Sequence, residues 1–200
     1  VFVGGPVHLF HISVRSVLRL RTAPDVEPAS FGTVVSSPVK ELQPQVLWGR
    51  RAAAWAPLFT DTLEHKFGKS LPSELDNCLM LRGPRLAQRE KSSLLFSYVA
   101  LRPHWVVVLR NADAEPPQWL RRAFRCTGVT VDTGSARLRA YVSKAPAYRG
   151  KAMRFGSPEG HMYAVLAKAV DANVRDPFAR GTLNPSWHQV AAAGCAAPPP

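Results

Sequence analysis

The segment ARLRAYV, residues 136–142, alternates arginine and tyrosine with apolar side chains. Successive side chains of a β-strand point to opposite faces, so we expect Arg137, Arg139 and Tyr141 on one face of a strand. Guanidinium groups bind phosphate oxygens, and an aromatic ring can stack on a nucleobase or on a cation. The spacing therefore predicts a strand face that contacts RNA.

Two further segments extend this predicted face. The runs HWVVVLRN, residues 104–111, and GKAMRF, residues 150–155, are typical of strands. With the loop before the second run, they complete the predicted RNA-binding set: Arg110, Arg137, Arg139, Tyr141, Arg149, Lys151 and Arg154. The alternative is a sheet face that is solvated, or one that is covered by the N-terminal part of the chain or by a partner protein.

The charge of the chain favours a polyanionic partner. The 26 lysines and arginines outnumber the 14 aspartates and glutamates, which gives a formal net charge of +12 over 200 residues. Such a surface suits RNA, DNA or anionic lipid head groups. A basic subunit that is neutralised by acidic protein neighbours in an assembly is the alternative.

The sequence contains no complete motif for catalysis or metal binding. FGKS, residues 67–70, is similar to the end of a phosphate-binding loop, but that motif needs a glycine five residues before Gly68, where Leu63 stands. The cysteines form no Cys-x-x-Cys pair, which argues against a zinc site. The histidines of the second half are isolated: His104, His161 and His188. We therefore predict no enzyme activity, no cofactor and no metal ion.

Composition and periodicity divide the chain into four predicted regions. Residues 1–45 are rich in proline, serine and valine and predict an extended basic arm. Residues 46–101 contain short helical patterns and predict a helical region. Residues 104–190 predict a folded domain, and residues 191–200 predict a disordered tail.

The predicted elements of the folded domain follow the order β-α-β-β-α. A strand over 104–111 precedes a helix over 113–128, and strands over 137–142 and 150–155 follow. Ser157 is expected to cap a second helix, whose apolar stripe reaches Val170. A fourth strand after residue 176 would complete an α+β fold of the ferredoxin-like split βαβ class.

Residues 104–190 resemble the RNA-recognition motif (RRM) family. VVVLRN is similar to the family's shorter signature, and Arg149, Gly150, Ala152 and Phe155 match the longer one, with one residue fewer before the phenylalanine. The resemblance implies an RRM-like sheet that binds RNA. Val108 and Ala152 stand where the family stacks bases on aromatic rings, which implies binding through phosphates rather than through base stacking.

Charge and resemblance together predict a non-catalytic RNA-binding component of a large ribonucleoprotein. An organellar, mitochondrial ribosome is the expected assembly, with rRNA and neighbouring proteins as partners. The opening 24 residues contain Arg15, Arg19 and Arg21 and no acidic residue, and they resemble the end of an organellar transit peptide. This predicts a location in the mitochondrial matrix, although an ordinary surface segment has a similar composition.

A second hypothesis is a structural role in a membrane complex. HWVVVLRNADAEPPQWL, residues 104–120, is similar to a Trp-Val…Pro-Pro-x-Trp pattern in a small accessory subunit of respiratory complex I, with shorter spacing. This resemblance implies an accessory subunit of a mitochondrial respiratory complex that is held by protein contacts. No apolar run reaches the length of about 18 residues that crosses a bilayer, so no transmembrane segment is predicted.

Overall fold

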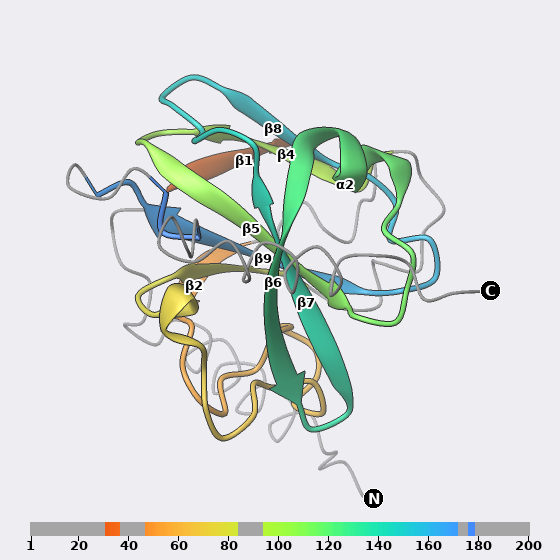
Figure 1. The fold of residues 1–200 in the computed structure, drawn as a ribbon. Coiled ribbons are helices and arrows are strands. Elements are labelled where there is room, and N and C mark those ends of the chain that lie inside the picture. Colours follow the sequence, from red (N-terminus) through yellow and green to blue (C-terminus); the bar gives the residue numbers. More distant parts are fainter. Residues whose placement is uncertain (1–30, 37–46, 84–93, 172–175, 179–200) are drawn as a thin grey trace, which may run out of the picture.

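The structure is a computed structural model that describes residues 31–36, 47–83, 94–171 and 176–178. Its strands form two antiparallel sheets (Figure 1). The smaller sheet has the order β1 (Gly32–Ser36), β4 (Phe96–Ala100), β8 (Ala152–Phe155). The larger sheet has the order β2 (Leu47–Arg51), β3 (Leu79–Arg82), β9 (Tyr163–Ala169), β5 (His104–Asn111), β7 (Ala136–Ser143), β6 (Phe124–Thr133). The described helices are short: a 3-10 turn η2 (Ser73–Leu75) and α2 (Gln118–Ala123).

The predicted α+β, split βαβ fold is therefore wrong, because the chain folds as a β-sandwich. The decisive segment is 163–169, which we expected as the buried stripe of a helix and which forms strand β9 instead. β9 pairs with β3 on one side and with β5 on the other, and its first five residues are buried. A short, continuous apolar run fits a doubly covered strand as well as a buried helix, so its periodicity cannot distinguish the two.

Other predicted elements are confirmed, shortened or replaced. The strands expected over 104–111 and 137–142 are β5 and β7. The helix expected over 113–128 is limited to the six residues of α2, and strand β6 begins at Phe124. The third expected strand exists as β8, but it belongs to the other sheet. The helical region predicted over 46–101 is wrong, since the described part of it forms β2, β3 and β4.

The two sheets enclose a core that we call the inter-sheet core. Its aromatic members include Phe96, Tyr98, Phe155 and Tyr163, and Leu120 of α2 also belongs to it. The rings of Phe96 and Phe155 stack with centroids 4.6 Å apart. Fully burying a side chain of this size contributes about 1.5–3 kcal/mol. This core holds the two layers together.

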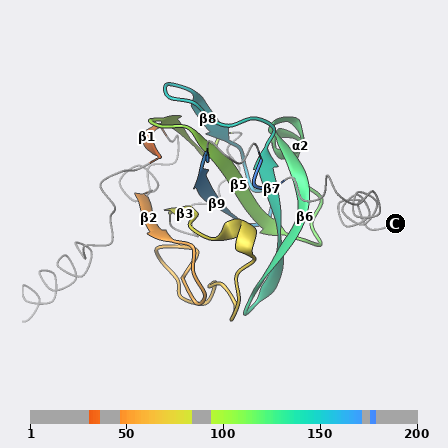
Figure 2. The same ribbon diagram turned by 60° about the vertical axis from the view of Figure 1, so that its left-hand side comes forward.

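The opposite face of the larger sheet is also covered. The segment between β2 and β3 lies beside it (Figure 2) and inserts Phe67 and Leu75 against Leu109 and Leu166. We call this cluster the second core. A backbone hydrogen bond of 2.7 Å from Gly68 N to Asp132 O ties the covering segment to β6. β5 and β9 are thus covered on both faces, whereas Thr130, Asp132 and Arg137 stay exposed at the β6–β7 end of the sheet. This corrects the continuous exposed sheet face that we predicted.

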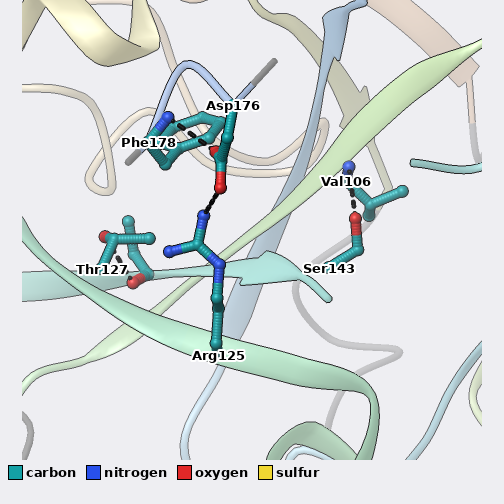
Figure 3. A network of polar contacts seen from close by, with 7 residues as sticks. Val106, Arg125, Thr127, Ser143, Asp176 and Phe178 are labelled. Atoms are coloured by element: carbon teal, nitrogen blue, oxygen red, sulfur yellow. Dashed lines mark hydrogen bonds and ion pairs between the residues drawn. The ribbon is translucent and has the colours of Figure 1, made fainter. Parts of the chain in front are cut away.

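The segment 176–178 is tied to β6 through Arg125 (Figure 3). The carboxylate of Asp176 pairs with the guanidinium of Arg125 and accepts the backbone N–H of Phe178 at 2.9 Å. Phe178 is buried in the second core. This is the described part of the region in which we expected a fourth strand. The rest of that region, the predicted arm apart from residues 31–36, and the predicted tail over 191–200 lie outside the described residues.

Gly156, directly after β8, allows Trp119 to pack closely. A Cβ atom at this position would lie 2.5 Å from Cδ1 of Trp119, whose Nε1 donates to the Ser157 carbonyl at 2.9 Å. We expect Gly156→Ala to lower the free energy of unfolding by about 1–3 kcal/mol through overpacking. Urea denaturation would measure this. Gly134→Ala is the matched control, because its added Cβ meets nothing within 4 Å. Equal stability of the two variants would contradict the expectation.

Candidate functional site

Arg110 of β5, the first of the predicted RNA-binding residues, is buried with 1% of its surface exposed. Its Nη1 donates to the carbonyl oxygens of Pro158, at 2.5 Å, and His161, at 3.1 Å, and its Nη2 donates to that of Glu115, at 3.2 Å. Burial lowers the pKa of the guanidinium. Arg110 therefore joins the loop before α2 to the loop before β9 and is not presented to a ligand.

The three residues predicted on β7 differ in their exposure. Tyr141 is buried in the inter-sheet core, where it cannot stack on a base. Arg139 pairs in register with Arg110 and is half-buried. Arg137 is exposed near the hairpin turn and forms an ion pair with Asp132 at 3.4 Å. β7 therefore does not present these side chains on a shared surface.

The remaining three predicted residues do lie near one another, on β8 and in the turn before it. Arg149 and Lys151 are exposed in the turn over residues 148–151, which we call the basic turn. Arg154 is exposed on β8, opposite Ser97 of β4. The alternation within AMRF predicted the exposure of Arg154 correctly, because only one face of β8 packs against the inter-sheet core.

Tyr148 is a candidate residue that we did not predict. It begins the basic turn and 57% of its surface is exposed. Its position directly before Arg149 could have identified it, since an aromatic residue among cations in a turn is free to face solvent. Together the four side chains offer three positive charges and one ring at one edge of the smaller sheet.

Backbone hydrogen bonds hold the basic turn in place. Gly150 N donates to Ala100 O at 2.8 Å, and Ala100 N donates to Lys151 O at 2.9 Å. Gly150 has φ of +85°, a left-handed conformation that favours glycine. A second pair of hydrogen bonds joins Ala147 to His104 at the start of β5. The turn is thus anchored to both sheets, so its side chains are presented from a fixed backbone.

The imidazole of His104 supports the same anchor from inside the protein. It is fully buried, its Nδ1 donates to the Arg102 carbonyl at 2.7 Å, and its Nε2 lies 2.7 Å from the Tyr98 hydroxyl. A carbonyl can only accept, so Nδ1 carries the proton and Nε2 accepts from the tyrosine. Burial lowers the pKa of His104 and keeps it neutral.

The electrostatic setting of the basic turn is positive. From Thr133 through Pro158 the sequence contains six lysines and arginines and no aspartate or glutamate. Exposed cations in such a segment are available to phosphates. Within the described residues, no group of three or more histidine, cysteine or carboxylate side chains could hold a metal ion. None of the described helices has the length and hydropathy to span a membrane.

No family model matches the chain, and no curated protein matches it. Among solved structures, it is similar to part of a β-glucuronidase from glycoside hydrolase family 2, with a TM-score of 0.50 and 19% sequence identity. The match covers 74% of this chain and 14% of that chain. The likeness is one of fold. It agrees with the β-sandwich and disagrees with the predicted α+β fold.

Proposed function

We propose that the protein is a non-catalytic RNA-binding component of a large ribonucleoprotein, such as a mitochondrial ribosome. The basic turn and Arg154 contact the RNA. The observation that carries the proposal is the hydrogen-bonded turn and strand at β8, where Arg149, Lys151 and Arg154 are exposed beside Tyr148 in a sequence segment without acidic residues. The net charge of +12 supports a polyanionic partner.

The chemistry at this edge favours single-stranded RNA. Three cations along a turn and an edge strand can follow a phosphate backbone, and the exposed ring of Tyr148 offers a surface on which one base can stack. The contacts are mainly electrostatic, since the exposed groups of this edge are three cations and one ring. The expected affinity is therefore strongly dependent on salt and only weakly dependent on sequence.

The triple variant R149Q/K151Q/R154Q is expected to bind single-stranded RNA about 100-fold more weakly at 0.1 M salt, with a salt slope smaller by about 2. The physical reason is that RNA releases fewer counterions when it binds a protein that lacks these three phosphate contacts. Fluorescence anisotropy with a labelled oligonucleotide across a salt series measures both quantities. All three residues are exposed, so the variant should keep the fold.

The charge-matched control is R51Q/K66Q/K69Q. These three cations are exposed on β2 and on the segment after it, away from the basic turn. If the control loses as much affinity as the triple variant, binding follows net charge and the basic turn is not the site. If neither the wild type nor the control binds RNA, the role in a respiratory membrane complex becomes the better hypothesis.

A further inference from the structure

A small pocket opens on the second-core side of the larger sheet and shares no residue with the basic turn. It has a volume of about 130 Å³. Its walls come from the segment after β2, the ends of β5 and β6, the start of β7, and the loop before β9 with the start of that strand. The buried part is mainly apolar, with Leu58, Phe59, Leu109, Leu138 and Ala164 beside the hydroxyl-bearing Thr133.

The walls are held by contacts within the segment after β2 and from this segment to the β6–β7 turn. His65, which lines the pocket, accepts or donates a hydrogen bond of 2.9 Å between its Nδ1 and the Ser135 hydroxyl in the β6–β7 turn. The ring of Phe59 meets the ring of His65 edge to face, with centroids 5.9 Å apart. Leu58 N donates to His65 O at 2.8 Å. The cavity therefore belongs to a fixed part of the fold.

The size and lining of the pocket restrict what it can bind. An apolar cavity of about 150 Å³ can hold a benzene ring, so one aromatic ring is the appropriate size. No lysine, arginine, aspartate or glutamate is among the described residues that line the pocket. An ion in this cavity would exchange most of its hydration for apolar walls and a few uncharged polar groups, which disfavours a charged ligand.

Two polar side chains stand where the pocket meets solvent. His161 is exposed and Asn111 is half-exposed, and both line the pocket. The Oδ1 atom of Asn111 accepts the backbone N–H of Asp113 at 2.9 Å, which leaves the amide N–H groups as donors. The imidazole of His161 can donate or accept. A ring that enters the pocket can thus place one hydrogen-bonding group at its mouth.

We propose that this pocket binds an uncharged aromatic molecule of about one ring that carries a single hydrogen-bonding group, as phenol does. The ring fills the space above Leu109 and Leu138, and the polar group bonds to His161 or Asn111. This inference does not depend on RNA binding, because the pocket shares no residue with the basic turn.

Phenol, benzene and benzoate are suitable probes, titrated into the full chain and followed by amide chemical shifts. Phenol is expected to bind about fivefold more tightly than benzene because of one added hydrogen bond. Benzoate is expected to bind at least about tenfold more weakly than phenol, because its charge must be desolvated. Shifts should gather at residues that line the pocket.

Two variants separate filling from hydrogen bonding. Ala136→Leu fills the pocket and should abolish the binding of phenol and benzene, while unchanged RNA affinity and circular dichroism would show that the fold is kept. His161→Ala should leave benzene binding unchanged and reduce the advantage of phenol. Undiminished phenol binding to Ala136→Leu would overturn the site, and so would the absence of saturable shifts. Benzoate binding as tight as that of phenol would overturn the ligand class.

Discussion

Replacing Arg110 with alanine is expected to lower the free energy of unfolding by about 3–5 kcal/mol. The guanidinium is enclosed and donates to the carbonyl oxygens of Glu115, Pro158 and His161. Its removal leaves these carbonyls without their donor and opens a cavity between two loops. Each unpaired buried acceptor costs about 1–3 kcal/mol, so the loss is large for one residue. Denaturation in guanidinium chloride measures the change.

Two further arginine variants define the origin of this loss. Arg137→Ala on the neighbouring strand removes the same charge from a side chain that is 67% exposed, and it should change stability by less than about 0.5 kcal/mol. Arg110→Lys keeps the charge, but it replaces the planar fork with one ammonium group and should restore only part of the stability. If Arg110→Ala and Arg137→Ala prove equally stable, Arg110 does not join the loops as described.

Acidification below pH 6.5 is expected to destabilise the protein through His104. Its folded pKa is lowered by burial, whereas the unfolded chain titrates near 6.5. The unfolded state therefore binds more protons between these two values, and stability falls as pH falls. For one group the slope reaches about 1.4 kcal/mol per pH unit. Above pH 6.5 both states are neutral at this residue and its contribution is complete.

Denaturation midpoints between pH 8 and pH 5 would measure this dependence. His104→Phe should lose the part of the slope due to this residue. It should also be less stable at pH 8 by about 2–3 kcal/mol, since the Tyr98 hydroxyl and the Arg102 carbonyl lose the imidazole. A wild-type slope that survives in His104→Phe would assign the titration to another group.

His104 also links stability to the proposed site, since its backbone pairs with Ala147 next to the basic turn. Protonation of His104 at low pH should therefore loosen the anchor of the turn and weaken RNA binding. His104→Phe cannot be protonated at this position and should lose that part of the pH dependence of RNA affinity.

Some elements were predictable from the sequence because local signals agree with the tertiary structure. The β-branched run over 104–111 and the alternation over 137–142 form β5 and β7. Exposure of Arg149, Lys151 and Arg154 also followed from local pattern, since a turn and a strand with one covered face obey simple alternation. The net charge of +12 required no structure at all.

Other features depend on contacts between distant segments. The run over 163–169 becomes a strand because β3 and β5 pair with its two sides. Arg110 and Tyr141 obey the same alternation as their neighbours, yet both are buried: Tyr141 lies in the inter-sheet core, and Arg110 is enclosed by the loops before α2 and β9. The sequence by itself determined the charge, two central strands and a cationic turn. Only the tertiary structure decided which face met solvent, because coverage depends on segments that are distant in the sequence, such as β4 for β7 and the segment after β2 for β5.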